Sequence, residues 1–236
     1  MRGVHPSNFI LSRTMPLRPP RAILFDLDGT LADTAPDLAA AANFLRSEHG
    51  LEPAPYEVLR PVASAGARGL IGAALDIHPG HAEYESLKVR FLDRYEANMV
   101  AHSKLFDSIP DMLAQLEARG IAWGIVTNKA ARFTDALVPQ IGLGHAACVV
   151  SGDTTPHPKP HPAPLLEAAK RLQLAPEDCW YVGDDLRDVQ AGKAAGMPTV
   201  AAAWGYCGHT APASWDADAL LHEPQKLLEL LGPSPT

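Results

Sequence analysis

The sequence predicts an α/β protein whose parallel, Rossmann-like sheet carries an inserted all-helical segment. Short apolar runs alternate with helical patterns along much of the chain, which is typical of right-handed β-α-β units in a parallel sheet. One long stretch, residues 36–104, contains only helical patterns. The chain has 236 residues, of which 47% are hydrophobic, so it can bury a sizeable core.

The first strand and the inserted helices are predicted from apolar spacing and from punctuating residues. An apolar run over residues 22–25 predicts a buried strand. Pro36, Gly50 and apolar residues at helical spacing predict a helix over 36–49. Further helices are expected at 55–62, 67–76 and 81–101.

Strands and helices alternate again after the insertion. Strands are expected at 121–126, 146–150, 180–182 and 198–202. Helices are expected at 110–119, 130–140, around 165–172, at 185–195 and at 224–231. Ligands of open parallel sheets bind outside the carboxyl ends of the strands, so the residues that follow each strand are the functional candidates.

Charge and composition exclude several partners. Lys and Arg number 20 and Asp and Glu 27, giving a formal charge of −7. This balance argues against nucleic acid as the main partner, because phosphate backbones are bound by clustered basic side chains. No apolar run approaches the ~18 residues of a membrane span. Three widely spaced cysteines predict small buried side chains in a reducing cytosol, so we expect a cytoplasmic protein.

The N-terminal residues 1–20 stand apart from this pattern. They carry scattered arginines and prolines and lack the continuous apolar stretch of a secretory signal. We interpret them as an extension that is expected to be flexible, with Met15 as an alternative start.

Two carboxylates follow the first predicted strand. Asp26 and Asp28 point to one side of it, because side chains alternate along a strand. A divalent cation would relieve their repulsion, and so would a proton held by one carboxyl group. Both outcomes suit a reaction with a nucleophile and a departing oxygen. The alternative is an Asp-rich turn that caps a helix.

The next two strand ends carry groups that suit an anion. Thr127 and Asn128 precede a predicted helix, where a hydroxyl and backbone N–H groups bind anions, although both residues also suit a plain N-cap. Lys159 lies between prolines that stiffen its loop and present the ammonium to a phosphoryl group or to the carboxylate that attacks it. The alternative is a solvated lysine.

Three acids follow the strand predicted at 180–182. Asp184 lies at its tip, and Asp185 and Asp188 lie in the first turn of a helix, where the helix dipole favours carboxylates. Capping explains one of these acids but not all three. A carboxylate cluster without Cys or His favours a hard cation, and Mg²⁺ fits because it binds carboxylates together with substrate phosphate.

These motifs, in this order, resemble those of the haloacid dehalogenase superfamily of phosphatases. They are residues 26–30 (DLDGT), 127–128 (TN), 159–160 (KP) and 183–188 (GDDLRD). The chain is similar to phosphoglycolate phosphatases over about residues 21–232, and most similar to the branch acting on N-acetylmuramic acid 6-phosphate. The resemblance implies a core domain of the haloacid dehalogenase (HAD) type at 21–34 and 105–236. It also implies a helical cap domain at 35–104.

The resemblance also implies a role for each acidic residue of the motifs. Asp26 would be the nucleophile that forms an aspartyl-phosphate, and Asp28 would protonate the leaving oxygen and then activate water. Mg²⁺ would be held by the Asp26 carboxylate, by the backbone carbonyl of Asp28 and by the Asp184 carboxylate. Many relatives have Thr or Ser where this chain has Asp185, which leaves open whether Asp184 or Asp185 is the main metal ligand.

The remaining predicted site residues would bind substrate or support the charged groups. The resemblance implies that Thr127 and the N–H of Asn128 bind phosphate oxygens, that Lys159 neutralises charge, and that Asp188 orients the lysine or a metal water. In the inserted helices, Arg68 lies between two glycines and is a candidate for binding a substrate carboxylate, which Arg grips bidentately. The alternative is a solvated helical arginine.

The sequence therefore predicts a Mg²⁺-dependent phosphatase that acts on a small carboxylated phosphomonoester, 2-phosphoglycolate or N-acetylmuramic acid 6-phosphate, as a monomer or homodimer. A phosphomutase of the same superfamily, of the β-phosphoglucomutase type, is the alternative enzyme. A catalytically inactive HAD-like binding module is the alternative outside catalysis, although none of the expected acidic groups is missing. Dehalogenase chemistry does not call for Asp28 or for the cluster around Asp184.

Overall fold

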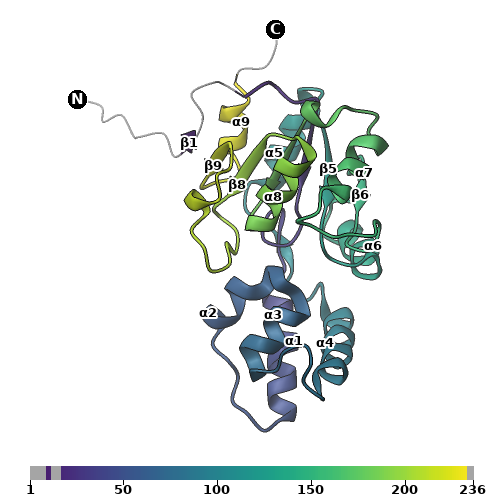
Figure 1. The fold of residues 1–236 in the computed structure, drawn as a ribbon, viewed down its shortest axis with the longest axis vertical. Helices are drawn as coiled ribbons and strands as arrows, with labels where there is room; N and C mark the ends of the chain where they lie inside the picture. The colour runs from purple at the N-terminus through teal and green to yellow at the C-terminus, as the bar shows by residue number, and fades with distance from the viewer. Residues whose placement is uncertain (1–8, 12–16, 233–236) are drawn as a thin grey trace, which may run out of the picture.

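The computed structural model describes residues 9–11 and 17–232 of the chain (Figure 1). The extension predicted to be flexible therefore lies largely outside the described residues, at 1–8 and 12–16. The molecule has two parts, a sheet flanked by helices and a smaller helical part at one end of that sheet (Figure 1).

The sheet has seven strands in the order β1-β9-β8-β7-β2-β5-β6. Neighbours from β9 to β6 are parallel, and β1 runs antiparallel to β9 at the edge. The strands are β1 (Phe9–Leu11), β2 (Ala22–Phe25), β5 (Ala122–Val126), β6 (Val149–Val150), β7 (Cys179–Gly183), β8 (Thr199–Ala202) and β9 (Ala219–Leu221).

Helices cover both faces of this sheet, which explains the continuous apolar run of β2. Ile23 and Phe25 pack in the cluster that includes α5, α6 and α9, whereas Leu24 packs in the cluster that includes α7 and α8. A strand buried on both faces has no polar alternation, as is usual in parallel sheets. The helices are α5 (Ile109–Ala118), α6 (Ala131–Gln140), α7 (Ala163–Arg171), α8 (Leu186–Ala195) and α9 (Lys226–Leu230).

The inserted segment forms a small helical bundle beyond the carboxyl ends of the strands (Figure 1). It consists of α1 (Ala35–Glu48), α2 (Tyr56–Leu59), the 3-10 helix η1 (Arg60–Ala65), α3 (Gly66–Leu75) and α4 (Tyr84–Asn98). The chain enters and leaves it through an antiparallel pair, β3 (Ala32–Asp33) and β4 (Lys104–Leu105). This arrangement supports the proposed division into a core at 21–34 and 105–236 and a cap at 35–104.

The predicted fold class is confirmed, and the differences are confined to short elements. The helix expected at 55–62 is one α-helical turn followed by the 3-10 helix η1. The pair β3–β4 and the strands β1 and β9 were not predicted. β1 lies within residues 1–20, which were expected to be a flexible extension, and it pairs with β9. Across residues 9–11 and 17–232, no helix is both long and apolar enough to cross a membrane.

Candidate active site

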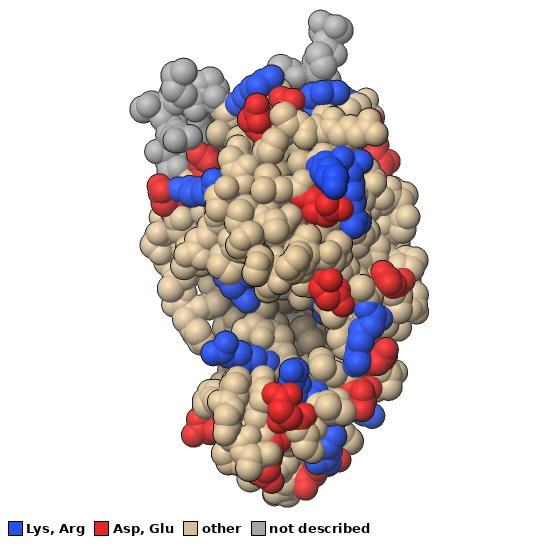
Figure 2. Space-filling model, turned by 45° about the vertical axis from the view of Figure 1, so that its right-hand side comes forward, with Lys and Arg blue, Asp and Glu red and all other residues tan. Residues whose placement is uncertain are grey.

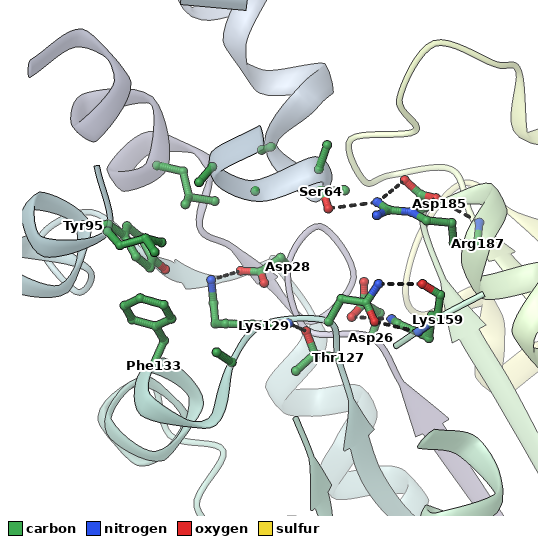
Figure 3. A pocket seen from close by; sticks show the side chains of 18 of the residues that line it. Asp26, Asp28, Ser64, Tyr95, Thr127, Lys129, Phe133, Lys159, Asp185 and Arg187 are labelled. Atoms are coloured by element: carbon green, nitrogen blue, oxygen red, sulfur yellow. Dashed lines mark hydrogen bonds and ion pairs between the residues drawn. The ribbon is translucent and has the colours of Figure 1, made fainter. Parts of the chain in front are cut away.

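Four segments of the chain meet at the carboxyl end of the sheet, beneath the cap. Asp26 follows β2, Thr127 follows β5, Lys159 lies in the loop after β6, and Asp184 follows β7. The first three line a cavity of about 290 Å³ whose other walls come from both the core and the cap (Figure 3). On the face shown in Figure 2, the surface is hollowed between core and cap.

Asp26 lies at the floor of this cavity and is 7% exposed. Its Oδ1 is 2.9 Å from Lys159 Nζ and forms an ion pair with that buried ammonium. Burial raises the pKa of Asp26 from 3.8 to about 7, although the Lys159 ammonium opposes this and the carboxylates of Asp188 and Asp28 add to it. Asp26 is therefore a buried carboxylate that lines the cavity and is paired with the Lys159 ammonium.

Lys159 is buried among oxygen atoms. Its Nζ donates to Asp188 Oδ1 at 2.7 Å, to Tyr181 Oη at 2.8 Å and to the Val126 carbonyl at 3.1 Å. Burial lowers the pKa of Lys159, but Asp188 and Asp26 raise it by more, so the ammonium stays charged. The lysine thus holds a positive charge at the cavity floor.

The Lys159 loop is fixed by hydrogen bonds as well as by its prolines. Asn128 Nδ2 donates to the Lys159 carbonyl at 2.9 Å, and the Lys159 N–H donates to Asn128 Oδ1 at 2.9 Å. The Asn128 side chain is therefore used for positioning, which leaves its backbone N–H for the predicted contact with phosphate. Thr127 is buried at the same cavity wall.

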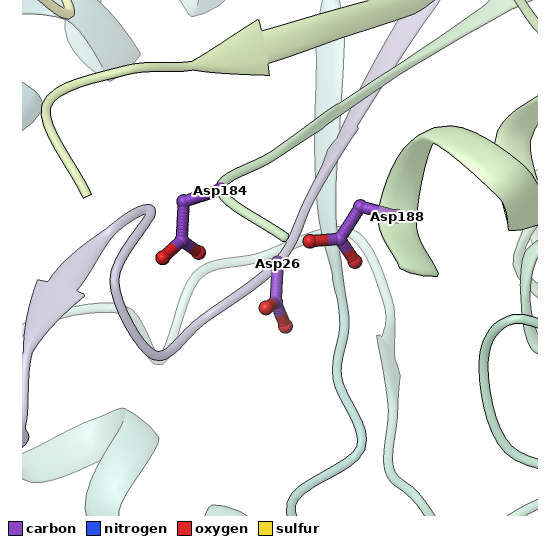
Figure 4. A group of neighbouring side chains, drawn as sticks. All are labelled: Asp26, Asp184 and Asp188. Atoms are coloured by element: carbon purple, nitrogen blue, oxygen red, sulfur yellow. The ribbon is translucent and has the colours of Figure 1, made fainter. Parts of the chain in front are cut away.

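Three buried carboxylates gather at this end of the sheet and fit a divalent cation. Asp26, Asp184 and Asp188 each offer an oxygen within 4.8 Å of the others (Figure 4). When ionised, these carboxylates and the Lys159 ammonium leave a charge of −2 in a buried place. Oxygen donors with this charge suit a hard cation such as Mg²⁺.

Asp184 is fixed from two sides and has no exposed surface. Its Oδ1 accepts from Thr30 Oγ1 at 2.9 Å and its Oδ2 accepts from the Tyr206 N–H at 2.8 Å. Burial, followed by the charges of Asp26 and Asp188, raises its pKa well above the usual range. Gly29 makes this packing possible, because a Cβ there would lie 2.1 Å from Asp184 Oδ2 and its φ of +87° disfavours other residues.

Asp185 is directed to a different partner. Its carboxylate accepts from the Arg187 N–H, Nε and Nη2 at 2.8 to 2.9 Å, and Arg187 Nη2 also donates to the Ser64 carbonyl in the cap. Burial raises the pKa of Asp185, but the hydrogen bonds and the charge of Arg187 lower it by more. The pKa of Asp185 therefore lies below its usual value. The geometry therefore favours Asp184 over Asp185 as the metal ligand.

This difference gives a testable expectation. Asp184→Asn should weaken Mg²⁺ activation by about tenfold or more, because it removes a carboxylate of the cluster, whereas Asp185→Asn should change it only slightly. The Mg²⁺ concentration for half-maximal activity measures both. A larger effect from Asp185→Asn than from Asp184→Asn would reverse the assignment.

Asp28 is held apart from the three clustered carboxylates. Its Oδ1 accepts from Thr34 Oγ1 at 2.5 Å and lies 3.0 Å from Lys129 Nζ. Of the predicted metal ligands, the structure places the side chains of Asp26 and Asp184 together, and the side chain of Asp188 joins them. The Asp28 carboxylate instead faces the cavity beside Lys129 (Figure 3).

Arg68 is not brought to this cavity. The buried residues of α3 are Leu70, Ile71 and Ala74, so Arg68 lies on the exposed face of the helix. It borders a separate surface depression together with Asp185 and Arg187. The flanking glycines therefore did not indicate a substrate contact.

Sequence reasoning missed several residues that support the site. Tyr181 Oη accepts from Lys159, and Tyr206 Oη accepts from the N–H groups of Thr34 and Ala35. Both tyrosines lie in or after predicted strands, where an aromatic side chain usually indicates core packing. Lys129 was visible directly after Thr127–Asn128, but its buried position was not evident.

The raised pKa of Asp26 predicts how stability changes with pH when divalent ions are removed by EDTA. The folded-state value of about 7 exceeds the ordinary 3.8, so the native state binds the extra proton between these values. Between about pH 4 and pH 7, the free energy of unfolding should therefore fall as pH rises, by on the order of a few kcal/mol. Mg²⁺ should oppose this loss, because it binds the ionised carboxylates.

Urea denaturation of wild type and Asp26→Asn across this pH range measures the effect. The free energy of unfolding of the Asn variant should rise relative to that of the wild type as the pH approaches neutrality. A difference that is independent of pH would contradict the raised pKa.

Known proteins resemble this chain over most of its length. The family described as haloacid dehalogenase-like hydrolase matches residues 23–202. A phosphoglycolate phosphatase of Xanthomonas campestris pv. campestris is 48% identical over 215 residues, covering 90% of this chain and 97% of the relative. An N-acetylmuramic acid 6-phosphate phosphatase of Pseudomonas aeruginosa is 40% identical over 213 residues, covering 89% and 94%.

A solved structure agrees with this relationship. A predicted phosphoglycolate phosphatase from Haemophilus somnus superposes with a TM-score of 0.81 at 27% identity, covering 89% of this chain and 97% of that one. The range matched by the family, residues 23–202, contains all the motifs that form the cavity floor. The chain therefore belongs to the haloacid dehalogenase-like hydrolase family and, as its phosphatase relatives indicate, to the phosphoric monoester hydrolases within it.

Proposed function

We propose that this protein hydrolyses a small carboxylated phosphomonoester in a Mg²⁺-dependent reaction, with 2-phosphoglycolate as the favoured substrate. The observation that carries the proposal is the Asp26 carboxylate, which is buried at the cavity floor 2.9 Å from the Lys159 ammonium and beside Asp184 and Asp188. A carboxylate nucleophile divides a difficult hydrolysis into two easier displacements.

The first displacement uses Asp26 and Asp28. An Asp26 oxygen attacks phosphorus while the bond from phosphorus to the ester oxygen breaks, which leaves an aspartyl-phosphate. Asp28, 3.0 Å from Lys129 and facing the same cavity, gives a proton to the departing oxygen. Lys159, together with the Thr127 hydroxyl and the Asn128 N–H, stabilises charge on the phosphoryl oxygens.

The second displacement regenerates the enzyme. Asp28, now ionised, takes a proton from water as the water oxygen attacks phosphorus and the bond to Asp26 breaks, which releases inorganic phosphate. Asp26, Asp184 and Asp188 would hold Mg²⁺, with the Asp28 carbonyl as the further ligand that the resemblance implies. When bound, Mg²⁺ offsets the buried carboxylates and stabilises negative charge on the phosphoryl group.

The size of the cavity supports 2-phosphoglycolate over N-acetylmuramic acid 6-phosphate. Its volume of about 290 Å³ lies at the lower end of the range for ligand sites, about 300 to 1,000 Å³. One methylene group and a carboxylate fit such a space more readily than a substituted amino sugar. The higher identity to the relative named phosphoglycolate phosphatase, 48% against 40%, agrees with this choice.

Phosphate release tests the proposal. The panel contains 2-phosphoglycolate, N-acetylmuramic acid 6-phosphate and β-glucose 1-phosphate, each measured with Mg²⁺ and with EDTA. We expect the highest kcat/KM for 2-phosphoglycolate and loss of activity in EDTA. Isomerisation of glucose phosphate without phosphate release would favour a phosphomutase, and inactivity on every ester in Mg²⁺ would favour a binding module.

A further inference from the structure

A second buried cation faces the cavity from the side opposite Lys159. The side chain of Lys129 is 6% exposed and lines the cavity together with Asp26 and Asp28. Its Nζ is 3.0 Å from Asp28 Oδ1 and 4.6 Å from the centroid of the Tyr95 ring, which comes from α4 of the cap (Figure 3). Lys129 thus lies where core and cap meet over the cavity.

The Lys129 ammonium has capacity for a further partner. An ammonium has three N–H donors, and one carboxylate oxygen of Asp28 occupies one of them. Burial lowers the pKa of Lys129, but Asp28 and Tyr95 raise it by more, so the group remains a cation. A cation with free donors at a cavity wall suits an anionic group.

The Tyr95 hydroxyl is a second polar group beside Lys129 that could bind an acceptor. The residue is 1% exposed, and its hydroxyl has no hydrogen-bond partner among the described residues. Figure 3 shows this hydroxyl pointing toward the Lys129 ammonium. Ser64 Oγ, also at the cap side of the cavity, is buried without a partner as well. Buried hydroxyls rarely stay unpaired, because a buried polar group without a partner loses its hydrogen bonds to water and gains none in return.

The position of Lys129 relative to Asp28 matches the geometry of the substrate. In the proposed function, Asp28 meets the ester oxygen, and the carboxylate of 2-phosphoglycolate is one methylene group beyond that oxygen. Lys129 touches Asp28 on the cap side. The other walls there include the apolar side chains of Leu38, Phe91 and Phe133, which offer no partner to a carboxylate.

We propose that Lys129 and the Tyr95 hydroxyl bind the carboxylate of the substrate and so determine the preference for carboxylated phosphomonoesters. This inference rests on the proposed function and assigns its specificity to residues other than Arg68. Lys159 binds the phosphoryl end of the substrate, and Lys129 binds the opposite end.

The test compares 2-phosphoglycolate with ethyl phosphate, in which a methyl group replaces the carboxylate. Lys129→Met should reduce the ratio of the two kcat/KM values by about tenfold or more, since hydrogen bonds to charged groups are strong. Tyr95→Phe, which keeps the ring and removes the hydroxyl, should reduce the ratio by about two- to tenfold. Lys170→Met, at an exposed lysine of α7, is the matched control and should leave the ratio unchanged.

A binding measurement supports the kinetic one without turnover. In Asp26→Asn protein, calorimetry should show that adding Lys129→Met weakens binding of 2-phosphoglycolate more than binding of ethyl phosphate. Equal losses for both ligands, in kinetics and in binding, would show that Lys129 serves only Asp28 and would overturn the inference. Inactivity of the wild type on both esters would instead contradict the proposed function.

Discussion

Asp26→Asn should reduce turnover by at least about a thousandfold while the protein remains folded, because an amide cannot act as the nucleophile. No neighbouring carboxylate is free to replace it. Asp184 accepts hydrogen bonds from Thr30 and Tyr206, and Asp188 accepts them from Lys159 and Asp185. The Asp26 carboxylate instead lines the cavity and is 2.9 Å from the Lys159 ammonium.

Folding should survive this substitution because it removes one of three buried negative charges. The pKa of Asp26, about 7, shows that the folded protein readily accepts its neutral form. Urea denaturation and steady-state hydrolysis of 2-phosphoglycolate measure the two expectations separately. Residual activity above about a tenth of wild type, in protein free of wild-type contamination, would refute the nucleophile assignment.

The layered fold could be predicted because its signals are local. β2 and β5 are buried on both faces and appear as short apolar runs, and the helices between strands carry apolar residues at helical spacing. The short strands β1, β3, β4 and β9 could not be predicted, since two or three residues contain no periodicity. Their existence depends on pairing with segments that are distant along the chain.

The candidate site could be predicted where its residues directly follow strands. Asp26, Thr127 and Asp184 had to share one sheet edge once the strands were known to be parallel. The choice between Asp184 and Asp185 could not be made, because it depends on the pairing of Asp185 with Arg187. Such pairing is a property of side-chain geometry, which spacing does not contain.

The cap residues were the least predictable part of the site. Helix rotation decides which side chains reach the cavity, and this rotation follows from packing among α1, α3 and α4. Arg68 consequently lies on an exposed face, whereas the buried Tyr95 of α4 presents its hydroxyl to Lys129. The glycines near Arg68 indicated a flexible backbone, but they did not indicate where the Arg68 side chain points.

Lys159→Met should abolish turnover and also destabilise the fold by about 3–5 kcal/mol, the usual cost of leaving a buried charge unpaired. Lys159 is 4% exposed and is the cation nearest to both Asp26 and Asp188, at 2.9 and 2.7 Å. Methionine occupies a similar volume, so the loss reports charge and hydrogen bonding more than packing. Urea denaturation in EDTA measures it, with Lys170→Met as the exposed control.

A second substitution distinguishes charge from packing in this result. If unpaired carboxylates cause the loss of stability, Asp26→Asn combined with Lys159→Met should be more stable than Lys159→Met alone. The double variant has one fewer buried carboxylate to repel the others. Mg²⁺ should also stabilise Lys159→Met more than wild type, since the ion would supply the missing positive charge. A double variant no more stable than Lys159→Met alone, with no added benefit from Mg²⁺, would mean that the lysine acts through packing and that the cavity floor is not a charge-balanced site.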